Sequence, residues 1–328
     1  RGRRSRISKT HLQADVSGKT ALQRNRKEKL NCRKDGVLEK GGVPVGLGLK
    51  YKDSRHIFEE RGENIPYLEF PLLRDSGIVN HGFSTRLGGV STGCFAEMNL
   101  SFDRGDRPEA VRENFRRIGK ALGVECEDMV LSQQTHTTNV RFVTAEDRGK
   151  GIVRERDYTD VDGMVTNVPG ICLVTSYADC VPLYFVDPVR KAIGLSHSGW
   201  RGTAGRIGQK TIEKMQQYFG SDPSDILAAI GPSVCMDCYE VSEDVVLRFQ
   251  ETFDKQAWPE LFYKKKDGKY QLNLWKANEI IFREAGILPE HMAVTNLCTH
   301  CNSSILYSHR AQGNRRGNLC AFLALKKD

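Results

Sequence analysis

Three segments of the chain each place a metal-binding or nucleophilic side chain at one end of a predicted apolar strand. They are SQQTH, which ends at His136, ADC, which ends at Cys180, and HSGWRG, which begins at His197. Two imidazoles and one thiolate can form a three-ligand zinc site that leaves its fourth position open, as catalytic zinc sites do. His136, Cys180 and His197 are therefore candidate metal ligands.

Two other interpretations stay open from these residues alone. The three lie too far apart along the chain to match a local metal-binding motif, so they could be core or turn histidines beside a small buried cysteine. Alternatively, Cys180 and His197 could act without a metal as nucleophile and base, with Asp179 orienting the imidazole. That arrangement would describe a cysteine hydrolase.

A second group of cysteines forms two Cys-x-x-Cys pairs, Cys235 with Cys238 and Cys298 with Cys301. Two such pairs can hold a structural zinc ion through four thiolates. Here the pairs are much farther apart than the roughly 15–20 residues that are usual in zinc ribbons. We therefore favour buried free thiols over a second metal site.

Apolar periodicity indicates the elements that must position these side chains. Short apolar runs bounded by turn residues predict strands over 68–73, 129–136, 138–144, 162–167, 170–177, 181–187 and 191–197. Apolar residues at helical spacing predict helices over 108–123, 202–220, 242–253 and 273–286. No tandem repeat or long linker divides residues 51–328, which we therefore treat as one domain.

The chain of 328 residues carries a formal net charge of +8, but this charge is unevenly distributed. Residues 1–50 hold fourteen Lys or Arg against four Asp or Glu, so the remainder is near neutral. We interpret residues 1–50 as a basic leader, disordered or non-native, that binds nucleic acid only weakly if at all. Neither a secretory signal nor an apolar run of membrane-spanning length is found, so we expect a cytoplasmic protein with reduced cysteines.

Several distant segments share the order and composition of one known protein family. They are HGFSTRLGGVST (81–92), MNL (98–100), SQQTH (132–136), DGMVT (162–166), ADCVPLYF (178–185), HSGWRGT (197–203), IGPSV with CYEV (230–234 and 238–241) and CTHCNSSILYSHRAQGNRRG (298–317). Together they resemble the laccase-domain family, also called YfiH/YlmD proteins, multicopper polyphenol oxidases or peptidoglycan editing factors. The agreement of so many separate segments makes the resemblance specific.

The resemblance implies a fold, a metal and an activity. The fold is α/β (α+β), with mixed β-sheets forming a central layered core flanked by helices. His136, Cys180 and His197 would hold Zn²⁺, with copper as an alternative. The implied activity is purine nucleoside phosphorolysis of adenosine, inosine and methylthioadenosine to free base and ribose 1-phosphate, with adenosine deaminase activity. Purine nucleosides and phosphate are then the expected partners of a monomer or small homo-oligomer.

Polar residues near these motifs have candidate roles in such a reaction, each beside a simpler structural role. Arg201 and Arg86 could clamp phosphate or ribose oxygens through their guanidinium groups, or form surface ion pairs. Gln133 and Asn99 could bind a purine edge or sugar hydroxyls, or stabilise turns. Asp179 could orient a ligand imidazole, act as acid or base, or accept backbone N–H groups at the strand end.

Two further sequence features affect the expected cleft. Thr137 follows His136 where many members of the family have glycine, so we expect the cleft beside the metal to differ in shape. Segment 307–317 concentrates Arg310, Arg315 and Arg316 among glycines. Because the family has a related element in this region, we expect the segment to border the site.

Two rival functions use the same residues. A copper polyphenol oxidase would need more clustered histidines than the motifs supply. A metal-independent hydrolase acting in peptidoglycan editing would need only Cys180 and His197. The sequence favours the zinc-dependent phosphorylase over both.

Overall fold

The computed structural model of the protein describes residues 46–327. Most of the expected leader, residues 1–50, lies outside the described residues, but its last five residues lie within them. There the backbone N–H of Lys50 donates to Asn302 Oδ1 at 2.7 Å, and Leu49 packs against the hydrophobic core. Residues 46–50 therefore pack with the body of the protein, which forms one compact unit.

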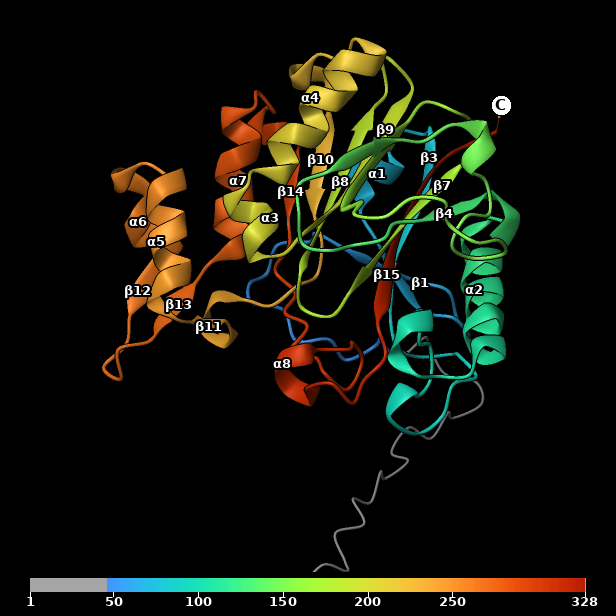
Figure 1. Ribbon diagram of the computed structural model, residues 1–328, viewed down its shortest axis with the longest axis horizontal. Helices are drawn as coiled ribbons and strands as arrows, with labels where there is room; N and C mark the ends of the chain where they lie inside the picture. The colour runs from blue at the N-terminus through green and yellow to red at the C-terminus, as the bar shows by residue number, and fades with distance from the viewer. Residues whose placement is uncertain (1–45, 328) are drawn as a thin grey trace, which may run out of the picture. The chain divides into compact units, whose positions relative to one another are not determined.

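Two six-stranded mixed sheets form the centre of the protein (Figure 1). Across the first sheet the order is β1 (Glu59–Arg61), β2 (Tyr67–Glu69), β3 (Val79–Ser84), β15 (Leu319–Leu325), β7 (Cys172–Tyr177) and β4 (Met129–Leu131). Across the second it is β14 (Met292–Val294), β10 (Leu227–Ile230), β8 (Val181–Asp187), β9 (Ala192–Ser198), β6 (Gly163–Thr166) and β5 (Val140–Phe142). A small third sheet has the order β11 (Glu240–Val241), β13 (Tyr270–Leu272) and β12 (Phe262–Lys264).

Eight α-helices surround the sheets within residues 46–327. They are α1 (Pro71–Arg74), α2 (Pro108–Leu122), α3 (Trp200–Ala204), α4 (Ile207–Phe219), α5 (Glu243–Thr252), α6 (Trp258–Leu261), α7 (Leu274–Glu284) and α8 (His309–Gln312). Three of them, α2, α4 and α7, cover the outer faces of the two large sheets. Helix α2 packs on the first sheet through a cluster that includes Phe115 and Phe322. Helices α4 and α7 pack on the second sheet through a cluster that includes Ile212 and Phe282. The layers therefore run helix, sheet, sheet, helix.

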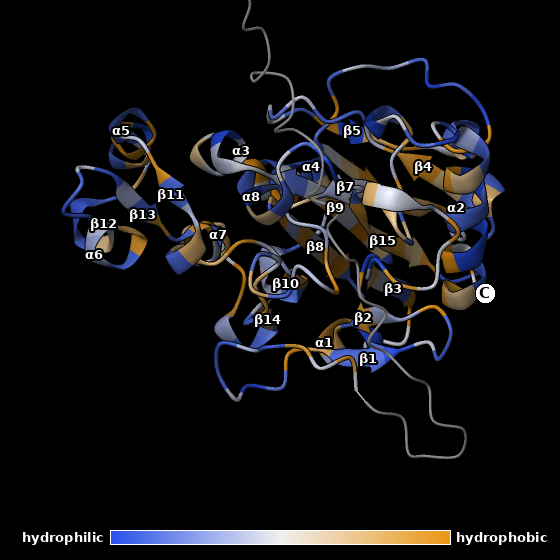
Figure 2. Cartoon of the chain, turned by 90° about the horizontal axis from the view of Figure 1, so that it is seen from below, coloured by the Kyte–Doolittle hydropathy of each residue, from blue (hydrophilic) through white to orange (hydrophobic). Residues whose placement is uncertain are grey.

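The two large sheets pack face to face around the main core. Side chains alternate along a strand, so Tyr184 of β8 faces the other sheet while its neighbours Leu183 and Phe185 face the helices. Figure 2 shows the strands of this region largely in the colours of hydrophobic residues and much of the helix surface in those of hydrophilic ones. Burial on both faces explains why β8 reads as a continuous apolar run in the sequence.

The predicted α/β class with layered mixed sheets is confirmed, but the predicted elements over 68–73 and 202–220 are each divided in two. Residues 68–73 are not one strand, because β2 ends at Glu69 and Pro71 begins α1. Proline lacks a backbone N–H and fixes φ at a helical value, so it suits a first helical turn better than a strand. The predicted helix over 202–220 is two helices, because Arg206 between α3 and α4 has the left-handed φ of 60°.

A membrane-spanning helix would need a long, almost uncharged apolar stretch. Within residues 46–327, no helix is both long enough and apolar enough to cross a bilayer.

Candidate metal centre

His136, Cys180 and His197, here called the metal centre, come from three separate parts of the fold. Cys180 lies in the turn between β7 and β8, and His197 lies on β9. Strands β8 and β9 are antiparallel neighbours in which Pro182 pairs with His197, so the sheet places His197 beside the strand that directly follows Cys180. His136 lies on the loop after β4, because that strand ends at Leu131 rather than at 136 as predicted.

The three side chains converge on one point. One potential ligand atom from each lies within 4.8 Å of the other two, and Cys180 Sγ is 4.0 Å from His136 Nε2. The two imidazole rings are 4.9 Å apart at an interplanar angle of 83°. Tetrahedral zinc with Zn–S near 2.3 Å and Zn–N near 2.0–2.1 Å needs donor atoms about 3.4–3.6 Å apart. The residues present therefore fit a zinc ion after a small closure of the Cys180–His136 distance.

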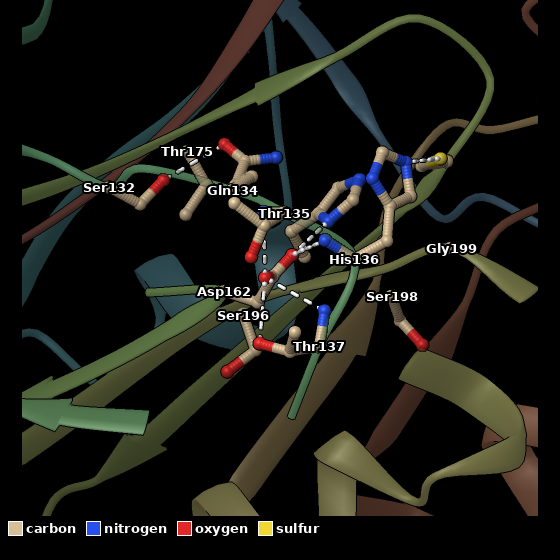
Figure 3. Close-up of polar contacts among 12 residues, drawn as sticks. Ser132, Gln134, Thr135, His136, Thr137, Asp162, Thr175, Ser196, Ser198 and Gly199 are labelled. Carbon is tan, nitrogen blue, oxygen red and sulfur yellow. Dashed lines mark hydrogen bonds and ion pairs between the residues drawn. The ribbon is translucent and has the colours of Figure 1, made fainter. Parts of the chain in front are cut away.

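Asp162 holds two of the three ligands in place. Its Oδ1 lies 2.8 Å from His197 Nδ1 and accepts the backbone N–H of His136 at 3.1 Å, and its Oδ2 accepts the backbone N–H groups of Thr135 and Thr137 (Figure 3). A carboxylate on Nδ1 fixes the tautomer of a ligand histidine and leaves Nε2 for the metal. The fully buried Asp162 therefore organises both His197 and the loop that carries His136.

Sequence reasoning gave Asp162 no role. The available signal was its place in DGMVT, directly before the apolar strand β6, where an aspartate more commonly serves as a turn residue. In the structure β6 is the neighbour of β9, and the backbone N–H of His197 donates to Asp162 O at 2.7 Å. The carboxylate thus reaches the imidazole from the beginning of the adjacent strand.

Electrostatics favour charge separation within this group. Burial alone would raise the pKa of Cys180, but the imidazoles of His197 and His136 outweigh it and lower the pKa to about 6. Burial opposes protonation of His197, yet Cys180 and Asp162 raise its pKa to about 9. Burial would also raise the pKa of Asp162, but hydrogen bonding from His197 overcomes it and lowers the pKa to about 2. The thiolate and the two imidazole side chains can together bind a divalent cation, and binding would release the proton held by His197.

Gly199 makes room for the metal centre. A Cβ atom there would lie 3.0 Å from His136 Cδ2 and 3.2 Å from Cys180 Sγ. Both distances are shorter than ordinary van der Waals contact, so a side chain would push the two ligands apart. The glycine of HSGWRG is therefore required for close packing rather than for a special backbone conformation, since its φ is −71°.

The carboxylate of Asp179, next to Cys180, binds the C-terminal loops and not the ligand imidazoles. Its carboxylate accepts Thr299 Oγ1 and the backbone N–H of Arg310, each at 2.6 Å. Of the roles considered for Asp179, this geometry fits the backbone acceptor, and the imidazole-orienting position is held by Asp162 instead. Asp179 thus joins the C-terminal loops to the turn that carries Cys180.

The other expected binding residues lie in different surroundings. Three guanidinium contacts of Arg86 go to the carbonyl oxygens of Ala96 and Ser303, and the group lies over the ring of Tyr307. Arg86 therefore cross-links loops and leaves few donors for phosphate. Arg201 is exposed and its guanidinium lies 4.3 Å from the ring centre of Trp200.

Asn99 and Gln133 both have turn contacts. Asn99 is fully buried; its side-chain oxygen accepts the backbone N–H groups of Ser101 and Asn318, and its amide donates to Asp106 and to a backbone carbonyl. It has no free surface for a substrate and instead anchors the chain just after Arg316. Gln133 accepts the backbone N–H of Asp160 through Oε1.

Arg316, in the segment expected to border the site, has unusual surroundings. It is 8% exposed, its Nε has no hydrogen-bond partner within residues 46–327, and its described contacts go to Gly317 and Asn318 rather than to a carboxylate. Burial, with repulsion from Arg104, lowers the pKa of Arg316 to about 10, while Asp179 and Cys180 act in the opposite direction. A buried cation of this kind, electrostatically coupled to the metal centre, is suited to an anionic ligand.

Comparisons with known proteins agree with the layered fold. Residues 80–326 match the family described as multi-copper polyphenol oxidoreductase laccase. The chain is 35% identical over 253 residues to purine nucleoside phosphorylase YlmD of Bacillus subtilis (strain 168), an alignment that covers 75% of this chain and 88% of that protein. The crystal structure of YlmD from Geobacillus stearothermophilus superposes with a TM-score of 0.75 at 34% identity, covering 83% of this chain and 99% of the other. The structure of Bacillus licheniformis hypothetical protein YfiH gives a TM-score of 0.75 at 32% identity, covering 79% and 96%.

Proposed function

Since the chain belongs to the multi-copper polyphenol oxidoreductase laccase family, we propose that it is a zinc-dependent purine nucleoside phosphorylase. The substrates would be adenosine, inosine and methylthioadenosine, and the products the free base and ribose 1-phosphate. The observation that carries the proposal is the convergence of two imidazoles and one thiolate within 4.8 Å. The purine nucleoside phosphorylase names of relatives at 35% identity support the reaction class.

The residues of the metal centre would hold zinc, with Asp162 fixing the imidazole of His197. When bound, zinc would supply a Lewis acid with an open coordination position, suited both to phosphorolysis and to the hydrolytic deamination of adenosine. Adenosine deamination is included in the proposed function because one open coordination position can serve both reactions.

Phosphorolysis also needs a binding position for phosphate. We assign this role to Arg316, because its buried guanidinium has a free donor and no carboxylate partner among the described residues. A guanidinium group binds a phosphate oxyanion through parallel N–H donors and also neutralises its charge. Arg316 would thereby hold the attacking phosphate near the metal centre, where its guanidinium interacts electrostatically with Cys180.

A metal-independent hydrolase remains the alternative, because the lowered pKa of Cys180 and raised pKa of His197 also describe a thiolate–imidazolium pair. Chelation separates the two: the hydrolase would keep its activity in 1,10-phenanthroline and lose it with iodoacetamide. Copper oxidation has less support, since the other metal-competent group within residues 46–327 contains four cysteines and no histidine.

The deciding experiment compares Cys180→Ala with Cys126→Ala, a half-buried cysteine outside both metal-competent groups. Cys180→Ala should lose one zinc ion per chain and release no hypoxanthine from inosine and phosphate. Cys126→Ala should keep its metal and its activity. Full activity in Cys180→Ala would overturn the proposal, and so would wild-type protein that forms no ribose 1-phosphate from any of the three nucleosides.

A further inference from the structure

We propose that Cys235, Cys238, Cys298 and Cys301, here called the tetrathiolate cluster, bind a second zinc ion that has a structural role. All four sulfur atoms lie within 4.8 Å of one another. The sequence spacing favoured free thiols, but the fold brings the two pairs together. The site is separate from the metal centre and shares no residue with it.

The sulfur geometry matches tetrahedral zinc. Cys238 Sγ and Cys301 Sγ are 3.6 Å apart. Four sulfurs at the usual Zn–S distance of about 2.3 Å would be about 3.8 Å from one another. A disulfide would require about 2.05 Å, and all four cysteines are free. The cluster is therefore arranged for a shared ion rather than for a covalent cross-link.

The backbone builds a tight turn at each pair. Cys235 precedes a single 3₁₀ turn, in which the N–H of Cys238 donates to Cys235 O at 3.0 Å. In the second pair, the N–H and the side-chain amide of Asn302 both donate to Cys298 O. Such turns point both cysteines of a pair to the same side.

The two turns are joined directly. Strands β10 and β14 are parallel neighbours, and the loops that follow them form a bridge between Ser233 and Cys298. The backbone N–H of Cys235 also donates to Cys298 Sγ at 3.3 Å. An N–H donor on sulfur stabilises the negative charge that a thiolate ligand carries.

A cation also lies beside the cluster. Asp237 lies between the two cysteines of the first pair, and its Oδ2 is 2.9 Å from Lys52 Nζ. Lys52 also interacts electrostatically with the sulfurs of Cys235 and Cys301. Four thiolates around one Zn²⁺ carry a net charge of −2, so a neighbouring ammonium group offsets part of it. Cys235 and Cys298 are 3% and 0% exposed, whereas Cys238 and Cys301 are half-buried, so the ion would be covered from water on one side.

The cluster has a connection to the metal centre that gives it a structural consequence. Thr299, inside the second pair, donates to Asp179, and Asp179 directly precedes Cys180. A zinc ion at the cluster would therefore fix the loop that holds Asp179 and, through it, the turn that carries Cys180. Loss of this zinc ion should lower the thermal stability of the protein more than it changes the activity of the metal centre.

The test measures zinc in the full chain, expressed with zinc and purified without chelator. Wild-type protein should contain two zinc ions per chain by mass spectrometry of the metal, and the double variant Cys238→Ser/Cys301→Ser should contain one and unfold at a lower temperature. The matched control Cys94→Ser/Cys126→Ser, which changes two half-buried cysteines outside both groups, should keep two.

A spectroscopic measurement covers the case in which the double variant does not fold. Cobalt added to metal-free Cys180→Ala protein should give strong thiolate-to-cobalt absorption, because only the tetrathiolate cluster remains to supply several thiolates. The proposal is overturned if the wild type and the double variant contain the same amount of zinc, if Cys180→Ala shows no such absorption, or if intact mass shows a disulfide within the cluster in protein purified under reducing conditions.

Discussion

Replacing Asp162 by Asn should weaken zinc binding at the metal centre roughly 10- to 100-fold. The Asp162 carboxylate accepts five hydrogen bonds: from His197 Nδ1, from three consecutive backbone N–H groups beginning at Thr135, and from Thr137 Oγ1. In the Asp162→Asn variant, one of the two carboxylate oxygens is replaced by an NH₂ group, which cannot accept at all. Each buried donor left without an acceptor costs about 1–3 kcal/mol.

Part of this free-energy cost lowers the affinity for zinc, and part lowers the stability of the fold. Loss of a carboxylate partner behind a ligand histidine typically lowers metal affinity about 10- to 100-fold, which corresponds to about 1.4–2.7 kcal/mol. The remainder should appear as reduced thermal stability of the metal-free protein. The assay is competition for zinc against a chelating dye, with circular dichroism at the same temperature to establish that the variant is folded.

Asp160→Asn is the matched control. Asp160 binds the side chains of Thr135, Thr137 and Asn139 on the same loop but does not contact His197. Its φ of 57° is also one that asparagine tolerates. Zinc affinity should therefore change little in Asp160→Asn. If a folded Asp162→Asn protein bound zinc as tightly as the wild type, Asp162 would not organise the metal centre as described.

Three further predictions address other parts of the structure. Gly199→Ala should reduce zinc affinity roughly tenfold, because the alanine Cβ would displace His136 and Cys180. Competition with a chelating dye measures this affinity. An unchanged affinity would contradict the prediction, because it would mean that the two ligands accommodate the Cβ without weakening zinc binding. Arg316→Gln should raise KM for phosphate by roughly tenfold or more with a smaller effect on KM for inosine, and equal effects on both would argue against a phosphate site. Burial lowers the pKa of His81 to about 3, and its Nε2 accepts the backbone N–H of Phe70. As the pH falls, His81 is therefore protonated in the unfolded chain before it is protonated in the folded protein. The free energy of unfolding should consequently fall as pH drops below about 6.5. His81→Gln should flatten that fall by up to about 1.4 kcal/mol per pH unit in urea unfolding, and parallel curves for the two proteins would contradict the assignment.

The sequence allowed the metal ligands to be predicted as candidates, since His136, Cys180 and His197 each follow or end an apolar run. It could not identify Asp162, because an aspartate before a strand has the same local pattern whether it ends a turn or supports a ligand. Asn99 shows the same ambiguity: its amide suits a purine edge or a turn, and only the fold shows that its polar atoms bind turns. Local residue type does not reveal which partners the fold will supply.

Contacts between strands that are distant in the sequence could not be predicted from local patterns. The strands of 162–198 were recognisable because they are consecutive and apolar, and the helix over 108–123 because its apolar face is regular. The proximity of the two Cys-x-x-Cys pairs depends on the parallel pairing of β10 with β14, which are separated along the chain by the small sheet and by helices α5 to α7. The spacing in the sequence could not show this contact, and it therefore favoured free thiols over a shared metal site.

The pairing of β8 with β9 has a consequence for how metal enters and leaves the protein. His197 lies on β9 and Cys180 directly precedes β8, the strand paired with it, whereas His136 is exposed and is carried by a loop. Two of the three protein ligands thus lie on or beside paired strands, whereas the backbone of His136 is held by Asp162 and only its exposed imidazole is free to rotate. Exchange of the ion should proceed through release of the His136 imidazole by rotation of its side chain, without unfolding of the sheets.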